Sequence, residues 1–239
     1  MFSSYTKTLP VLLILFSCCL WGQNGLDVYF DEPAIEIRQV QPPGHISGIL
    51  PHPDLVTTLS REFFSAIRVL PKEFIQKSGI RYVTFLQDMK FKGFPAAGMA
   101  SKATNTIYLS TTFKEKTIYH ELYHIFDPIR ENQYWCRLNP HNFIYTGSKY
   151  YSENLSRSKS RRANRNVPKY QFDFVSRYAM SNEREDRAET FAYMIFEKRH
   201  FLNRTRRSKV LKKKMDYIIE ITSKEQLISK SFWYNHFRR

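Results

Sequence analysis

The stretch His120-Glu121-Leu122-Tyr123-His124 decides how the rest of the chain is interpreted. Its two histidines are four residues apart, so on a helix both imidazoles lie on one face and can reach the same ion. Apolar residues flank the stretch at Ile118, Ile125 and Phe126, which predicts that this helix is largely buried. Because two histidines and a glutamate are costly to bury without a partner, we expect a metal ion between them.

A bound zinc ion accounts for each of these residues. Zinc accepts neutral imidazole nitrogens at about 2.0–2.1 Å, and a catalytic site leaves one position open for water. Glu121 follows the first ligand and can take a proton from that water, whose pKa zinc lowers to about 7. We therefore expect one Zn2+ per chain, held by His120 and His124, with Glu121 as the general base. The alternative is an ordinary helix that carries two surface histidines and a glutamate.

Two histidines leave a third protein ligand to be identified. The third and sixth positions after His124 hold Asp127 and Arg130 rather than glycine and histidine, which excludes the metzincin class. The remaining candidates are a carboxylate on a later helix and the other histidines, which are His45, His52, His141, His200 and His236.

A predicted helix near Asn182 offers the carboxylates. Glu185 and Glu189 share one of its faces with the small and apolar residues Ala188, Ala192 and Phe196. Two carboxylates on a core-facing stripe need a cation or hydrogen-bond donors, so we prefer this helix to the histidines. The alternative is an exposed face whose charges are balanced by Arg184, Arg187 and Lys198.

The order of the predicted elements indicates an α+β fold. Thr111 or Thr112 can cap the central helix, and Ser181-Asn182 is a predicted N-cap for the later one. In chain order we expect a helix over 54–70, strands over 80–86 and 105–111, the central helix over 112–126, an irregular segment over 131–170, a helix from about 174 or 182 to 201, and a basic helix over 208–221.

Length and composition restrict the class of protein. The chain has 239 residues, of which 42% are hydrophobic and 15% aromatic, and a formal net charge of +15. The length suits a single domain with a substantial core, and the aromatic content excludes wholesale disorder. Three cysteines exclude a dense disulfide framework, and we expect Cys136 to be a small buried apolar residue.

The N-terminus predicts export. Lys7 precedes an apolar run over 10–21, which is too short to span a bilayer because a spanning helix needs about 20 residues. The segment Leu15-Phe16-Ser17-Cys18 resembles a bacterial lipobox, with Cys18 as the lipidated residue. We expect a lipid anchor at the bacterial cell envelope rather than a transmembrane helix, or otherwise a secreted or periplasmic protein. The alternative is an uncleaved anchor or a buried N-terminal helix.

We expect three segments: a lipoprotein-type signal peptide over 1–17, a tether over 18–50 and one domain over 51–239. Most of the positive charge lies late in that domain, in acid-free blocks at 157–169, within a basic insert of about 155–170, and at 198–214. Such blocks can attract an anionic surface or polymer, although a solvated loop and a solvated helix face are the simpler explanation. Nucleic acid is not an expected partner, because export argues against it and no nucleic-acid-binding motif is present.

Two segments that follow HExxH carry a family resemblance: Tyr178-Ala179 and Glu185-Asp186-Arg187-Ala188-Glu189-Thr190-Phe191-Ala192. This arrangement resembles the anthrax-lethal-factor-like group of gluzincin metallopeptidases, and especially its exported bacterial zinc-binding relatives. Segments 105–109 and 138–145 are also similar to theirs, so the resemblance covers about residues 54–200.

The resemblance implies a zincin-like α+β domain with a small antiparallel or mixed sheet, an HExxH helix and a second helix that carries a glutamate ligand. It implies that Glu185 is the third zinc ligand, that Glu189 contacts a ligand residue without binding the metal itself, and that Tyr178 stabilises the oxyanion. Asp127, one turn after His124, is a candidate to orient a ligand imidazole, although water or a backbone carbonyl can do the same.

These inferences predict an exported zinc-dependent peptidase that acts on a peptide or protein. Glu121 activates the water and returns its proton to the leaving amine, while Tyr178 donates a hydrogen bond to the oxyanion. If Tyr178 is instead a packed aromatic residue, the donor would be sought among Tyr145, Tyr150, Tyr151 and His141. The alternative function is a non-catalytic surface lipoprotein that contains zinc and binds an anionic partner through its basic C-terminal half.

Overall fold

The computed structural model describes residues 35–127, 132–147 and 170–238. The lipobox residue Cys18 and the first basic block, 157–169, lie outside the described residues. Within the described ranges, every helix is too short or too polar to cross a membrane.

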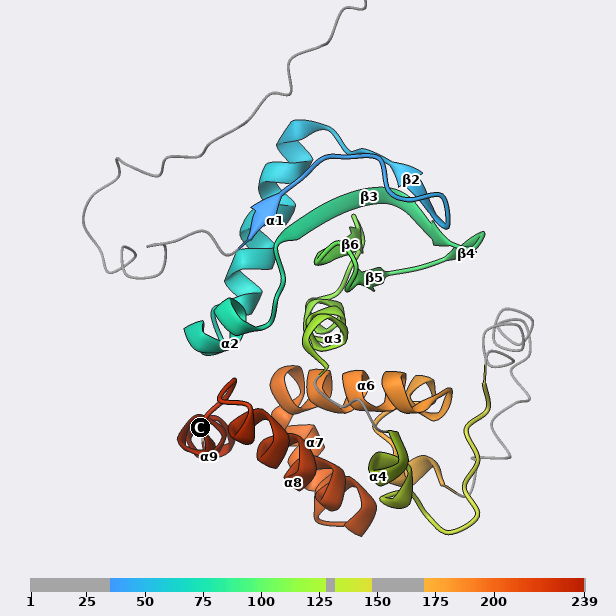
Figure 1. Cartoon of the computed structure of the whole chain (residues 1–239), viewed down its shortest axis with the longest axis vertical. Helices are drawn as coiled ribbons and strands as arrows, with labels where there is room; N and C mark the ends of the chain where they lie inside the picture. Colours follow the sequence, from blue (N-terminus) through green and yellow to red (C-terminus); the bar gives the residue numbers. More distant parts are fainter. Residues whose placement is uncertain (1–34, 128–131, 148–169, 239) are drawn as a thin grey trace, which may run out of the picture. The chain divides into compact units, whose positions relative to one another are not determined.

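A mixed β-sheet forms one layer of the described fold (Figure 1). The strands in chain order are β1 (Glu36–Ile37), β2 (Ile46–Ile49), β3 (Tyr82–Phe91), β4 (Phe94–Pro95), β5 (Gly98–Ser101) and β6 (Thr106–Ser110). The main order is β1-β3-β6-β5, with β2 and β4 paired to β3. Strand β3 runs parallel to β1 and β6, whereas the pairings of β2 and β4 with β3 and of β5 with β6 are antiparallel. The expected α+β class with a mixed sheet is confirmed, and β5 lies at one end of the main order.

Residues 35–50 contribute two short strands, β1 and β2, to this sheet. The backbone N–H of Glu36 donates to the Arg81 carbonyl and that of Arg38 to the Val83 carbonyl, each at 2.8 Å. Strand β2 then pairs with the C-terminal part of β3. The tether expected over 18–50 is therefore wrong for its second part, because strands of two and four residues are too short to show a sequence period.

The described residues form eight α-helices. These are α1 (Pro53–Ile67), α2 (Lys72–Lys77), α3 (Glu115–Phe126), α4 (Asn132–Arg137), α6 (Glu183–Phe196), α7 (Lys198–Thr205), α8 (Lys209–Lys224) and α9 (Lys230–Arg238). The helix expected to end near 201 is two helices, because Glu197 leaves helical geometry with φ −112° and ψ 38°. Helix α3 begins later than Thr112, whose side chain instead bonds Ser110 at 3.0 Å in the preceding turn.

Helix α3 is buried along most of its length, as its apolar flanks predict. Figure 1 shows it between the sheet and α6, and every residue from Ile118 to Ile125 is buried. It contacts β5, β6 and α1 as well as α6. Alternate residues of the sheet join the same core, namely Val83 and Phe85 of β3 and Ile107 and Leu109 of β6.

An aromatic cluster fixes α3 to α6. The ring centroid of Phe191 on α6 lies 5.2 Å from that of Tyr123 and 5.8 Å from that of Phe126. Phe74 of α2 stacks on Phe191 at 5.6 Å, and Trp233 of α9 meets it edge-on at 6.2 Å. Since such ring pairs contribute about 0.5–1.5 kcal/mol each beyond their buried area, the cluster stabilises this helix contact.

Helix α4 corrects the expectation for Cys136, which is exposed. Its neighbour Trp135 is fully buried. Consecutive helical residues point about 100° apart, so a short helix that buries Trp135 turns Cys136 outward.

A buried ion pair joins α6 to α8. Lys214 Nζ donates to Asp186 Oδ2 at 2.8 Å, and both side chains are 0% exposed. Trp135 Nε1 and Tyr145 Oη donate to the same oxygen, each at 2.8 Å. The ammonium group of Lys214 also lies over the ring of Phe174. Several segments of the chain therefore meet at one carboxylate.

We expect Lys214→Met to lower the free energy of unfolding by about 3–5 kcal/mol, because it leaves the buried Asp186 carboxylate without its counterion. Lys212 is a matched control, since it lies on the same helix and pairs with Asp216 at the surface. Lys212→Met should change the free energy by at most about 1 kcal/mol. Urea denaturation measures both changes, and equal losses would contradict the structural role of Lys214.

Candidate metal centre

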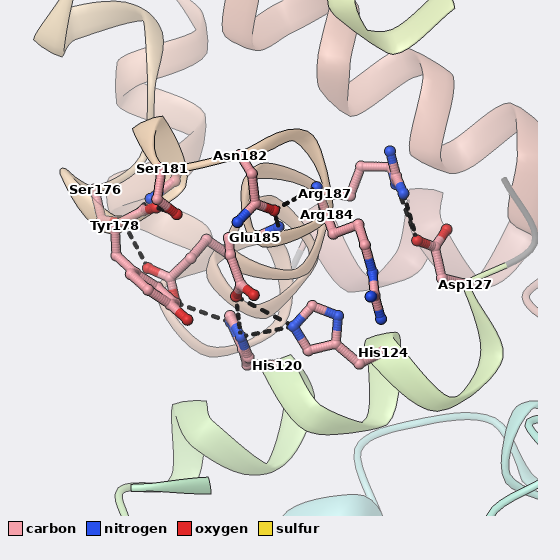
Figure 2. Close-up of polar contacts among 12 residues, drawn as sticks. His120, His124, Asp127, Ser176, Tyr178, Ser181, Asn182, Arg184, Glu185 and Arg187 are labelled. Carbon is pink, nitrogen blue, oxygen red and sulfur yellow. Dashed lines mark hydrogen bonds and ion pairs between the residues drawn. The ribbon is translucent and has the colours of Figure 1, made fainter. Parts of the chain in front are cut away.

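Helix α3 brings the two histidines of HExxH together on the side that meets α6 (Figure 2). His120 is 6% and His124 7% exposed. Their Nε2 atoms are 3.1 Å apart, and the two ring planes are inclined at 83°. The spacing of four residues thus directs both nitrogens to one point.

Glu185 reaches the same point from the first turn of α6. Asn182 caps this helix, because its side-chain oxygen accepts hydrogen bonds from the backbone N–H groups of Arg184 and Glu185, each at 3.0 Å. The predicted N-cap is therefore confirmed. Glu185 Oε2 lies 3.0 Å from Nε2 of His120 and 3.2 Å from Nε2 of His124.

These three atoms form a nearly equilateral triangle with sides of 3.0, 3.1 and 3.2 Å, which we call the ligand triangle. A tetrahedral zinc ion with bonds of about 2.0–2.1 Å separates its ligand atoms by about 3.3 Å. The ligand triangle therefore has the size that zinc needs without movement of either helix. Within the described part of the chain, no other group of His, Cys, Asp or Glu side chains is arranged in this way.

The hydrogen-bonding capacity of these atoms also favours a cation. His120 Nδ1 lies 3.1 Å from Glu189 Oε1, and a carboxylate only accepts, so Nδ1 carries a proton. In a neutral imidazole, Nε2 of His120 is then an acceptor. It faces Glu185 Oε2, a second acceptor, at 3.0 Å. This contact is repulsive unless a positive charge enters the site.

A second proton on His120 or a metal ion can supply that charge. Burial alone would lower the pKa of His120, but its hydrogen bonds to Glu185 and Glu189 raise the pKa to about 10. Burial alone would raise the pKa of Glu185, but its hydrogen bonds to both histidines hold the pKa well below its ordinary value. A metal ion that binds at neutral pH must therefore displace a proton from His120.

Glu189 contacts His120 on the side away from the ligand triangle. Its other carboxylate oxygen lies 3.2 Å from Lys116 Nζ and accepts a hydrogen bond from Ser176 Oγ at 2.6 Å. Burial alone would raise the pKa of Glu189, but these partners and His120 lower it to about 2. A carboxylate that stays ionised behind an imidazole fixes both the orientation of the ring and the position of its proton.

The structure pairs Asp127 with Arg187 instead of an imidazole. Asp127 Oδ2 accepts hydrogen bonds from Nε and Nη2 of Arg187 at 3.1 and 2.6 Å (Figure 2). Nδ1 of His124 has no hydrogen-bond partner among the described residues. The expected role of Asp127 is therefore wrong, because α3 ends at Phe126 and Asp127 adopts φ −26° and ψ 101°, outside the helical region.

Glu121 is buried where α3 meets the strand β5. A Cβ atom on Gly98 of β5 would lie 2.8 Å from Cγ and Oε1 of Glu121 and 2.8 Å from Cγ2 of Thr117. Glycine is therefore the residue that leaves space for this carboxylate. Burial raises the pKa of Glu121, although His120 and His124 oppose the shift. A raised pKa suits a carboxylate that exchanges protons near neutral pH.

Tyr178 lies just before α6, in a 3-10 turn over Tyr178–Met180. Its ring centroid is 5.7 Å from that of His120, with the two planes inclined at 31°. Figure 2 shows the ring beside His120 and below Ser176. The phenol is thus a neighbour of the ligand triangle.

The other residues considered for these roles lie elsewhere or are not described. Tyr145 donates its hydroxyl proton to Asp186 at 2.8 Å, and Tyr150 and Tyr151 lie outside the described residues. The remaining histidines stand apart from the ligand triangle: His52 caps α1, His236 contacts the Met194 carbonyl, and His45, His141 and His200 are exposed.

Sequence reasoning missed several contributors to the site, namely Gly98, Lys116, Ser176 and the pairing of Arg187. Lys116 left a usable signal, because it lies four residues before His120 and thus on the same helical face. The other contacts join residues far apart in the chain, so no local pattern reveals them.

The second basic block is not only a solvated helix face. Lys214 is buried against Asp186, and the guanidinium of Arg204 donates to the backbone carbonyls of Gln171, Phe174 and Val175. Two of its charges therefore maintain the fold. The exposed basic residues of this block are Arg199, Arg206, Arg207, Lys209, Lys212 and Lys213.

Comparisons with known proteins agree with the arrangement of these elements. A solved structure described as "a putative zinc-binding metallo-peptidase", from Bacteroides caccae ATCC 43185, is similar to this chain with a TM-score of 0.55. The match covers 87% of this chain and 85% of that one at 12% sequence identity, so it shows a shared fold. No curated protein matches the sequence. A family model described as "Putative zinc-binding metallo-peptidase" matches residues 90–237, and the chain therefore belongs to that family.

Proposed function

We propose that this chain is a zinc-dependent peptidase of the gluzincin type, with His120, His124 and Glu185 as the protein ligands of one zinc ion. The observation that carries the proposal is the ligand triangle, whose sides of 3.0, 3.1 and 3.2 Å fit a tetrahedral zinc ion. Membership of the zinc-binding metallo-peptidase family supports the same metal and a peptide or protein substrate. The sequence motifs after HExxH support a place in the lethal-factor-like group.

The chain's own residues divide the remaining chemistry. When bound, zinc supplies a Lewis acid that lowers the pKa of water and polarises a peptide carbonyl. Glu121 takes the proton of the attacking water and passes it to the leaving amine, and its burial, which raises its pKa, makes it a stronger base for the first of these transfers. Glu189 holds the Nδ1 proton of His120 and so leaves Nε2 free to bind the metal. To Tyr178, whose ring lies beside His120, we assign the hydrogen bond to the oxyanion.

Two variants of HExxH separate metal binding from proton transfer. His120→Ala removes a ligand and should lose zinc. Glu121→Gln keeps all three ligands, so it should retain one zinc per chain while hydrolysis falls by about 10³-fold. Metal analysis after chelator-free purification and cleavage of a peptide library measure the two properties. Wild-type protein with well under one equivalent of zinc would contradict the metal site, and an active Glu121→Gln would contradict the base.

Tyr178→Phe tests the oxyanion donor. It should preserve folding and zinc content and leave KM nearly unchanged, while kcat falls by about 10–10³-fold because one transition-state hydrogen bond is lost. Tyr234→Phe is a suitable control, since this tyrosine of α9 is 65% exposed and should have no effect. A zinc-loaded Tyr178→Phe enzyme with full kcat would show that Tyr178 is a packed aromatic residue.

We also propose export and a lipid anchor at Cys18, on the basis of the N-terminal sequence. Metabolic labelling with a fatty-acid analogue should label the wild type and not Cys18→Ala. Unchanged labelling of that variant would contradict the lipobox assignment.

The non-catalytic alternative requires the basic C-terminal half as a binding surface. The internal roles of Lys214 and Arg204 weaken that case, because their charges are used within the fold. The Glu121→Gln comparison separates the two functions, since a non-catalytic protein would show no hydrolysis to lose.

A further inference from the structure

We propose that Asp127 and Arg187 are a positioning pair, which holds α6 against the end of α3 so that the Glu185 carboxylate meets both histidines. The inference rests on the proposed zinc site and deepens it. The two residues keep the ligand triangle in shape and do not themselves contact the metal.

The pair connects the two ligand-bearing helices close to the ligands themselves. Asp127 follows His124 by three residues, and Arg187 follows Glu185 by two. The guanidinium donates through Nε and Nη2 to one carboxylate oxygen, at 3.1 and 2.6 Å. Figure 2 shows this contact beside the ligand triangle, between the two helices. A double contact of this kind fixes direction as well as distance.

Burial makes the pair strong and sensitive to substitution. The Arg187 side chain is 1% and the Asp127 side chain 6% exposed. Water and salt therefore screen the interaction little. Removal of either partner breaks both hydrogen bonds that join α6 to the end of α3 and takes from a buried charge the oppositely charged group that it contacts.

The end of α3 is itself anchored to the sheet. Lys102, in the turn between β5 and β6, donates from Nζ to the backbone carbonyl of Asp127 at 3.0 Å. The backbone N–H of Asp127 donates to the Tyr123 carbonyl at 2.8 Å. Asp127 is therefore held in place by the sheet and by its own helix. Its contact with Arg187 holds α6 in position relative to the two histidines of α3.

The ligand triangle tolerates little movement. Glu185 Oε2 is 3.0 and 3.2 Å from the two imidazole nitrogens, and a metal site holds its ligands within about 0.5 Å of the productive geometry. Loss of partners that orient metal ligands lowers metal affinity by about 10–100-fold. We expect the same range for loss of this pair.

The neighbouring ion pair on α6 supplies a matched control. Asp186 and Lys214 are also buried, and they join α6 to α8 and not to α3. Lys214→Met should therefore destabilise the fold in a similar way without a specific effect on Glu185. If the proposal is right, variants of the two pairs lose similar stability, but only variants of the Asp127–Arg187 pair lose zinc affinity.

The experiment measures the zinc dissociation constant by competition with a chelator and stability by urea denaturation. It compares the full-length wild type with Arg187→Met, Asp127→Asn, the double variant, Arg187→Lys and Lys214→Met. Arg187→Met and Asp127→Asn should each bind zinc about 10–100-fold more weakly than the wild type. The double variant should bind no more weakly than either single variant, and Arg187→Lys should recover part of the affinity. Lys214→Met should stay within about twofold of the wild type.

Wild-type zinc affinity in Arg187→Met and Asp127→Asn would overturn the proposal. An equal loss of affinity in Lys214→Met at equal loss of stability would also overturn it, because the effect would then follow stability. If Arg187→Met fails to fold, Asp127→Asn and Arg187→Lys give the same comparison. Failure of the wild type to bind zinc would instead refute the proposed function, so the two failures are distinguishable.

Discussion

The structure depends on the contact between α3 and α6, where three atoms that can bind a cation meet inside the protein. His120 and His124 come from one helix and Glu185 from the other, and their atoms form a triangle with sides of 3.0–3.2 Å. Such a set is unstable without a positive charge, because lone pairs face one another and the histidines are buried. The aromatic contacts of Phe191 and the cap at Asn182 hold the helices in the arrangement that keeps the set together.

The charged residues at the start of α6 are also used for contacts inside the protein. Three successive residues have three different partners: Glu185 contacts the histidines, Asp186 contacts Lys214 of α8, and Arg187 contacts the end of α3. Successive helical residues are turned by about 100°, so a helix enclosed by neighbours can direct each charge to a different one. A run of charges that is typical of a solvated surface is here a set of internal contacts, and this explains how such a polar helix packs in a core.

The features that local patterns in the sequence predict correctly depend on residues close together in the chain. The HExxH spacing and the cap at Asn182 are of this kind, and both are present as expected. The position of Asp127 one turn after His124 makes it a candidate to orient an imidazole, but the structure pairs it with Arg187, which is 60 residues away. Strands β1, β2, β4 and β5, of two to four residues, exist through their pairing with β3 and β6 and have no period of their own. Long-range contacts of this kind leave no pattern in a single sequence.

Anomalous X-ray scattering from crystals of the zinc-loaded protein, measured on both sides of the zinc absorption edge, tests the central claim most directly. We predict one zinc peak per chain, about 2.0–2.2 Å from Nε2 of His120, from Nε2 of His124 and from a carboxylate oxygen of Glu185. A zinc peak at another place, or a zinc ion bound by the histidines without Glu185, would contradict the claim.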